Sequence, residues 1–206
     1  MIKLLTEKYH QLLSKTQVID GIPPLLLRLY LAPVMMQAGW NKVIGFEDVV
    51  MWFGNTEWGL GLPFPALLAA LAAGTELIGG ALLVIGLATR LVALPLMFTM
   101  LIAALTVHME NGWLAIADAS SWLADGTILL NQNVVDSVDR LGAAKSILQE
   151  HGNYDWLTGS GNLVVLNNGI EFAATYFIML SALFVIGGGR FFSVDYWLNK
   201  KLSGQA

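Results

Sequence analysis

Four long apolar stretches constrain what this chain of 206 residues can fold into more than any other feature. They run over residues 22–44, 65–88, 91–109 and 169–188. A helix needs roughly 20 apolar residues to cross a hydrocarbon core of about 30 Å, and lipid offers the backbone no other hydrogen-bond partner. Only 13% of the residues are charged, against about 25% in a typical soluble domain. The pattern predicts an all-α membrane protein built on a bundle of four transmembrane helices.

Basic residues outside these spans predict the orientation of the chain. They precede the first span, lie in the turn between the second and third, and follow the fourth: Lys3, Lys8, Lys15, Arg90, Arg190, Lys200 and Lys201. With four crossings all of them fall on one side, and retained positive charge marks the cytoplasmic side. We therefore expect a multi-pass protein of the bacterial inner membrane with both termini in the cytoplasm.

The chain accordingly divides into five parts. Residues 1–21 form a cytoplasmic segment whose apolar positions recur at helical spacing, which predicts an amphipathic helix on the inner membrane surface; a partly ordered tail is the alternative. Residues 22–109 carry the first three spans and residues 169–188 the fourth. Residues 110–168 form a periplasmic insertion and residues 189–206 a cytoplasmic tail.

The periplasmic insertion has a pattern of its own. Apolar residues from Val134 to Leu148 follow helical spacing, and Gly152 stands where a cap would end the helix, so we expect an amphipathic helix. Gly159-Ser160-Gly161 lies between two short apolar runs and suggests a hairpin. Six tryptophans also fall on the outer side, where interfacial anchoring explains them and a docking surface is the alternative: Trp40, Trp52, Trp58, Trp113, Trp122 and Trp156.

Five ionisable residues lie inside or at the ends of the spans: Arg28, Lys42, Glu76, His108 and Glu171. An ionised side chain at mid-membrane costs at least about 2.5 to 3.5 kcal/mol, so each should face the bundle interior and have a partner. Counting about 1.5 Å per residue places Arg28 and Glu76 within one helical turn in depth, and we expect them to pair. Lys42, His108 and Glu171 fall at outer ends and are candidates for a second polar cluster.

Each of these residues also has a purely structural interpretation. The Arg28 and Glu76 pair would fix helix register, His108 would cap its span, and Lys42 would reach the headgroups. Headgroup contact is the preferred interpretation for Arg90. The small residues around Glu76 favour close helix packing, with a flat groove for a quinone ring as the alternative.

The residue inventory excludes several classes of chemistry. The chain has no cysteine, so it cannot exchange disulfides or hold an iron–sulfur cluster. Only one histidine lies at membrane level, which excludes bis-histidine haem ligation within one subunit. The net charge of −4 and the lack of a basic patch argue against nucleic acid. Scattered methionines are more typical of packing than of copper sites: Met35, Met36, Met97, Met100 and Met109. We therefore expect no metal site, and a quinone is the one cofactor left open.

Several motifs between Leu25 and Met109 carry a family resemblance. They are Leu27-Arg28-Leu29, Ala38-Gly39-Trp40-Asn41-Lys42, Leu60-Gly61-Leu62-Pro63, Glu76-Leu77-Ile78-Gly79-Gly80 and Gly86-Leu87-Ala88-Thr89-Arg90. In order and spacing this part of the chain resembles the DoxX family of small four-span membrane proteins. The resemblance implies a polar set of Arg28, Lys42, Glu76 and Arg90.

Members of this family resemble or include the small subunit of thiosulfate:quinone oxidoreductase, and others accompany redox complexes as non-catalytic partners. Some redox relatives carry cysteines, which this chain lacks, so direct handling of thiols is disfavoured. The remaining motifs resemble HvfX-type proteins, encoded beside pathways for copper-binding modified peptides: 111–115, 151–156, 167–171 and 187–190.

The sequence therefore favours a membrane subunit or accessory of a redox or copper-binding-peptide maturation system, not catalytic on its own. The alternative is a quinone-binding oxidoreductase subunit of the thiosulfate:quinone oxidoreductase type. Trp40, Asn41 and Trp113 are candidates for ligand or partner contact. We expect membrane lipid and a periplasmic protein as partners, in a homo- or hetero-oligomer.

Overall fold

The computed structural model describes residues 3, 6–10, 19–124 and 131–204. All regular elements in these ranges are helices, and the one β interaction among them is an isolated antiparallel bridge between Ile116 and Leu166. The all-α prediction is confirmed. The chain forms two compact units, the first made of Met1–Thr99 and Tyr176–Ala206 and the second of Met100–Thr175.

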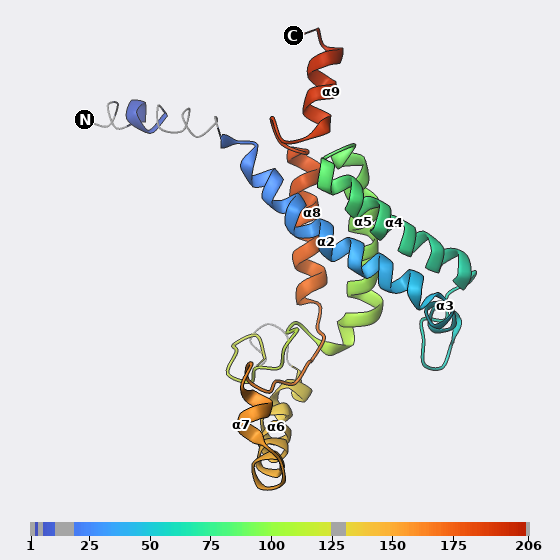
Figure 1. Ribbon diagram of the computed structural model, residues 1–206, viewed down its shortest axis with the longest axis vertical. Coiled ribbons are helices and arrows are strands. Elements are labelled where there is room, and N and C mark those ends of the chain that lie inside the picture. Colours follow the sequence, from blue (N-terminus) through green and yellow to red (C-terminus); the bar gives the residue numbers. More distant parts are fainter. Residues whose placement is uncertain (1–2, 4–5, 11–18, 125–130, 205–206) are drawn as a thin grey trace. The chain divides into compact units, whose positions relative to one another are not determined.

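The helices include one along each of the four apolar stretches. They are α2 (Ile22–Ile44), α3 (Phe46–Gly54), α4 (Pro65–Ile85), α5 (Thr89–Ala103), α6 (Gln132–His151), α7 (Tyr154–Thr158), α8 (Glu171–Ile186) and α9 (Val194–Leu202) (Figure 1). Proline in the first turn starts α2 and α4, where the missing N–H has no helical partner in any case. Gly86 ends α4 in the left-handed region with φ +66°, a conformation that glycine adopts without strain.

Within the described part of the chain, two helices are long and apolar enough to cross a membrane. One is α4, and the other is α5 with its continuation, over Thr89–Asn111. Helix α8 is also apolar but has 16 residues. On α4 the residues Leu67, Leu71 and Ile78 are all more than half exposed. Large apolar side chains in such a row suit lipid better than water.

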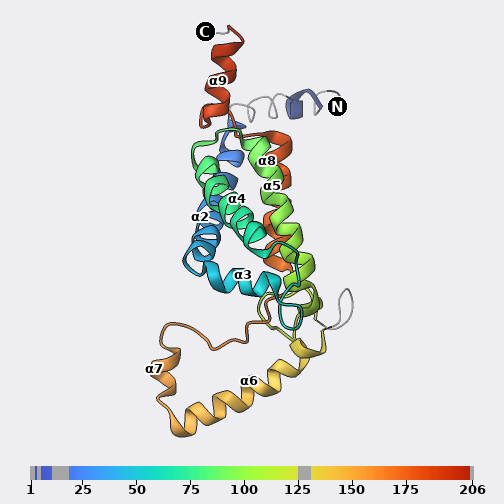
Figure 2. The ribbon, with the colours of Figure 1, turned by 90° about the vertical axis from the view of Figure 1, so that its right-hand side faces the viewer.

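The first unit is organised around α2 and α4, which lie side by side and antiparallel (Figures 1 and 2). The buried face of α4 runs along one side of the helix, through Ala69, Ala73, Glu76, Gly79, Gly80 and Leu83. Three further contacts bring in the remaining long helices. Gly79 of α4 faces Leu96 of α5, Met97 of α5 accepts from Ser181 of α8, and Tyr30 of α2 lies 6.4 Å from Tyr176 of α8, between ring centroids.

The second unit confirms one prediction and contradicts another. The amphipathic helix of the insertion is α6, which starts at the side-chain cap of Asn131 and ends at Gly152. The hairpin is wrong, because residues 154–158 form helix α7. The Asn153 side chain accepts from the Trp156 backbone N–H at 3.2 Å, and such a cap overrides a weak strand pattern. Figure 2 shows the sharp reversal of the chain between α6 and α7.

Only part of the expected N-terminal amphipathic helix is described. Residues 6–10 are helical, and residues 1–2, 4–5 and 11–18 of that prediction lie outside the described residues.

Candidate functional site

The buried acid of α4 has a basic partner on α2. Glu76 is 3% exposed, and its Oε2 accepts a hydrogen bond from the Lys42 Nζ at 2.6 Å. The side chain of Lys42 is 27% exposed, against 5% for that of Glu76. The carboxylate is therefore closed off, whereas the ammonium keeps partial access to the surroundings through its long stem.

Close contact between the α2 and α4 backbones encloses this pair. A Cβ added at Gly39 would lie 2.6 Å from the Leu77 backbone nitrogen and 2.8 Å from the Ala73 carbonyl oxygen. One added at Gly80 would lie 2.9 Å from the Ala32 carbonyl oxygen. No side chain fits at either position, which is the arrangement that small residues permit between membrane helices. At these positions the small residues around Glu76 serve packing.

Arg28 does not pair with Glu76, so that expectation is wrong. Arg28 is fully buried, and its Nη1 donates to the Leu83 carbonyl oxygen at 3.2 Å and to that of Val84 at 3.5 Å. Its Nη2 donates to the Phe192 carbonyl oxygen at 2.7 Å. The bonds to Leu83 and Val84 satisfy carbonyls in the last turn of α4, where a helix also favours positive charge, and the bond to Phe192 reaches the segment between α8 and α9.

The register of the two helices explains the error. Gly39 lies against Ala73 and Leu77, and Gly80 lies against Ala32. Arg28 is therefore level with the C-terminal end of α4, and the first turns of α2 extend beyond that end. The depth estimate placed the start of the first span at the inner boundary of the hydrocarbon core and the start of the second at the outer boundary, which shifts Arg28 toward Glu76 by about two helical turns.

Asp195, which the sequence analysis did not single out, lies at the same end of the first unit as Arg28. The two carboxylate oxygens of Asp195 accept from the backbone N–H groups of Ala88 at 2.6 Å and Thr89 at 2.8 Å. Asp195 thereby caps the start of α5, which favours negative charge. One sequence signal could have pointed to Asp195. Ser193 caps α9 by accepting from the Tyr196 N–H, and Asp195 is the acid in the first turn of that helix.

In the second unit, two motifs from the sequence analysis lie against each other. The segments 112–117 and 165–171 exchange backbone hydrogen bonds around the bridge. The Asn167 side chain donates to the Asn111 carbonyl oxygen at 2.7 Å and to that of Leu114 at 2.6 Å. The Asn131 side chain donates to the same Asn111 carbonyl at 2.6 Å. We call Asn111, Asn131 and Asn167 the asparagine clasp.

The proposed cluster of Lys42, His108 and Glu171 remains a prediction, and the structure gives each of these residues a partner of its own. Lys42 is held by Glu76. The Nδ1 of His108 lies 2.9 Å from the Asn168 carbonyl oxygen, so this nitrogen carries the proton. The Glu171 carboxylate accepts from the Ala115 N–H at 2.9 Å. His108 and Glu171 thus stabilise the backbone of the second unit.

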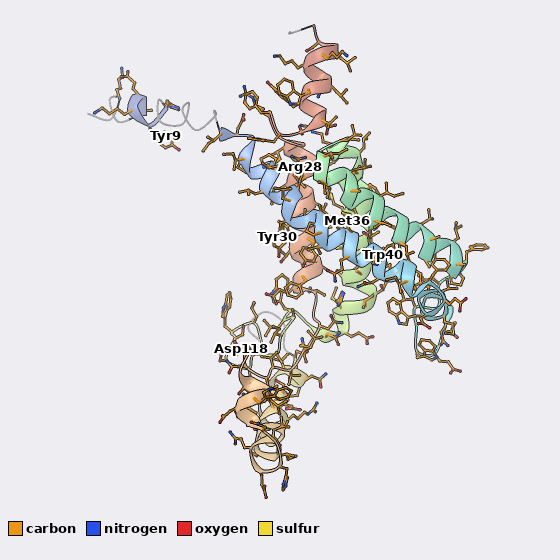
Figure 3. All side chains as sticks on the ribbon, in the orientation of Figure 1. Tyr9, Arg28, Tyr30, Met36, Trp40 and Asp118 are labelled. Atoms are coloured by element: carbon orange, nitrogen blue, oxygen red, sulfur yellow. The ribbon has the colours of Figure 1, made fainter. Side chains whose placement is uncertain are left out.

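The remaining candidate residues differ in their accessibility. Trp40 is 54% exposed and Asn41 is exposed, and Figure 3 shows Trp40 toward the end of α2 opposite Arg28. Trp113 is half-buried beside the asparagine clasp, and Arg90 is exposed at the start of α5. Contact of these residues with a ligand or partner remains a prediction.

The described residues contain no group of three or more His, Cys, Asp and Glu side chains that could hold a metal ion. An isolated electrostatic feature of the second unit is Asp118. The Ser120 hydroxyl and backbone N–H donate to its carboxylate at 2.6 Å and 2.9 Å, and these bonds lower the pKa of Asp118. The acid caps a local turn.

Comparisons with known proteins give one family match and one curated relative. Residues 24–109, which include α3, α4, α5 and all of α2 except its first two residues, match the family described as DoxX. The chain is 34% identical over 97 residues to the "Putative oxidoreductase CatD" of Bacillus subtilis (strain 168). That match covers 47% of this chain and 68% of the relative. No solved structure matches the chain significantly. The region that matches the family contains Arg28, Lys42 and Glu76.

Proposed function

The chain belongs to the DoxX family, and on that premise we propose that it is a small membrane subunit or accessory of a redox system. In this proposal it does not carry out the redox reaction itself. The observation that carries it is the enclosure of Glu76, which is 3% exposed and hydrogen-bonded to Lys42 between two closely packed helices. An acid held in this way stabilises a helix interface and is poorly placed to meet a substrate.

We propose that the second unit binds the partner of the protein on the periplasmic side. Trp122 is 63% exposed and Trp156 is 76% exposed, and exposed tryptophans are typical anchors of protein interfaces. The partner system proposed is the maturation of a copper-binding peptide. The support for this narrower role is the resemblance of the asparagine-rich and tryptophan-rich motifs to HvfX-type proteins.

A crosslinking experiment tests the partner role. A photoreactive amino acid at Trp156 should crosslink to a protein encoded by a neighbouring maturation gene, when the two are produced together in cells. The same group at Ser203, in the proposed cytoplasmic tail, is the control and should not. Equal crosslinking from both positions, or from neither, would contradict a partner site on the second unit.

We also propose that α2, α4, α5 and α8 all cross the inner membrane, with both termini in the cytoplasm. Helix α5 reaches 23 residues with its continuation to Asn111, whereas α8 has 16 residues, or about 24 Å, so the ends of α8 would lie close to the headgroups. The chain has no cysteine, which allows a direct test. In spheroplasts a membrane-impermeant maleimide should label Ser146→Cys, whereas Ser203→Cys should react only after lysis. Labelling of Ser203→Cys in intact spheroplasts would contradict this topology.

A second candidate is a quinone-binding oxidoreductase subunit, which the description of the Bacillus subtilis relative as an oxidoreductase favours. The purified full chain should be assayed for quinone reduction, alone and together with its candidate partner. Our proposal predicts no turnover by the chain alone. Intrinsic turnover that is lost in a folded Glu76→Gln variant would overturn it, provided that Glu47→Gln, an exposed acid of α3, keeps its activity.

A further inference from the structure

A large cleft lies at the end of the first unit where Arg28 and Asp195 tie the helices together. Its volume is about 1060 Å³, and it lies between the start of α2, the start of α5, the end of α8 and the start of α9. The Gly187-Gly188-Gly189 turn lines it, which is a motif that the proposed function leaves without a role. The cleft lies far along α2 from the Lys42 and Glu76 pair.

Two arginines at the cleft give it a positive character. No hydrogen bond or ion pair within the described ranges holds the Arg90 guanidinium. That group lies over Gly187, where an added Cβ would lie 3.2 Å from the Arg90 Nε. Arg190 contacts Asp20 at 3.3 Å through one nitrogen, and both side chains are about half exposed. Its other donors are therefore available to a ligand.

Asp195, which lines the cleft together with Asp20, does not cancel the positive charge of the two arginines. Both oxygens of Asp195 accept backbone hydrogen bonds from the start of α5. Asp195 also interacts electrostatically with the buried Arg28. Lys200 and Lys201 follow on α9, directly after Asn199, which lines the cleft. An anion that enters the cleft would meet Arg90, which has no acidic partner among the described residues, and Arg190, which Asp20 contacts through only one nitrogen.

The walls beside the arginines are apolar. Pro23, Pro24, Leu91 and Ile186 line the cleft, and Leu91 is 72% exposed. A small inorganic anion gains nothing from such walls, whereas an amphiphile buries acyl carbons against them at about 0.8 kcal/mol per CH₂. We propose that the cleft binds the headgroup and upper acyl chain of an anionic phospholipid, with the phosphate held between Arg90 and Arg190.

This inference goes beyond the redox role and does not depend on it. It agrees with the charge pattern that marks this end of the bundle as cytoplasmic, because anionic lipids attract basic residues there. It also gives the glycine turn a function. Gly187 and Gly189 adopt φ +80° and +91°, and the missing side chain at Gly187 leaves room for the Arg90 guanidinium.

Native mass spectrometry of the purified full chain in detergent tests the proposal. Phosphatidylglycerol and phosphatidylcholine with identical acyl chains are titrated separately, and inorganic phosphate is added as a competitor. The unmodified protein should bind phosphatidylglycerol at least about five-fold more tightly than phosphatidylcholine. Inorganic phosphate should displace little of the bound lipid.

Variants locate the site. Arg90→Gln and Arg190→Gln should each weaken phosphatidylglycerol binding by about five-fold, and the double variant by more. The matched control is Arg140→Gln, because Arg140 is also exposed and contacts an acid, Asp136, at 3.8 Å. It should change nothing. Equal binding of the two lipids, full displacement by inorganic phosphate, or unchanged binding in the double variant would each overturn the proposal.

Discussion

The contact between α2 and α4 can be tested with a single added methyl group. In Gly39→Ala the new Cβ would lie 2.6 Å from the Leu77 backbone nitrogen. Ordinary contact begins at 3.4 Å, and backbone atoms on both sides cannot swing away as a side chain would. The two helices must therefore separate, and the Lys42 and Glu76 contact must lengthen with them.

The separation needed is about 0.8 Å, and a gap of this size forfeits roughly a quarter to a half of the dispersion energy of each facing atom pair. Overpacking of this kind costs about 1 to 3 kcal/mol. Alanine also stabilises a helix by about 1 kcal/mol relative to glycine. The net effect of Gly39→Ala alone is therefore ambiguous, and a second glycine must serve as the reference.

Gly74 provides that reference, because an added Cβ there has no neighbouring atom within 4 Å. It lies inside α4, so Gly74→Ala gains the same helix propensity without the clash. The difference between the two variants isolates the overpacking, and about 1 to 3 kcal/mol corresponds to roughly 2 to 12 °C in Tm for a chain of this size. Tryptophan fluorescence during heating of the detergent-purified proteins measures it. If Gly39→Ala melts at or above the Tm of Gly74→Ala, the close approach of α2 and α4 is wrong.

Three further predictions concern the hydrogen bonds. Lys42→Met strands a buried carboxylate and should cost about 3 to 5 kcal/mol, whereas Glu76→Leu leaves a partly exposed ammonium and should cost about 1.5 to 3 kcal/mol; the double variant should melt above both singles, and additive losses would refute the pairing. Asp195→Asn should lower stability by about 1 to 2 kcal/mol through loss of the charged α5 cap, and an unchanged Tm would refute that role. Asn167→Ala removes one donor from each of the Asn111 and Leu114 carbonyls, which keep Asn131 and the Gly169 N–H as their other donors, and it should speed limited proteolysis of the second unit while α2 and α4 keep their protection; uniform protection would exclude the asparagine clasp as a stabilising contact.

The sequence predicted the helices well because their length and polarity depend on local chemistry. The first apolar stretch was expected at 22–44, and α2 occupies Ile22–Ile44. The second was expected to end at residue 88, but Gly86 ends α4 at Ile85. The predicted end of the second span is therefore three residues too far along the chain. The Gly86 cap that ends α4 is itself a local feature of the sequence.

The partners of the charges were predicted less well because they depend on the register of two helices. Composition places Arg28 and Glu76 within apolar helices, but it does not reveal how far one helix slides past the other. When the register of α2 against α4 differs by about two turns from the expected one, Arg28 meets the carbonyls of Leu83 and Val84 instead of Glu76. The predicted hairpin failed for a different reason, because the Asn153 cap favours a short helix over the strand pattern of residues 154–158.

The order of contacts along α2 suggests why one half of the chain carries the family match and the other half the narrower motifs. Arg28 binds the end of α4, Ala32 and Gly39 follow at the close backbone contacts, and Lys42 binds Glu76. The charged contacts lie 14 residues apart, or about 21 Å along the helix, and the glycine contacts lie between them. These contacts fix the interface between α2 and α4 at both ends and pack it in the middle, so its residues can change little without loss of stability. A partner-specific function is therefore easier to place in a unit that does not contribute to that seam between α2 and α4. The second unit meets this condition, since its order comes from Asn111, Asn131 and Asn167 and from bonds within residues 100–175.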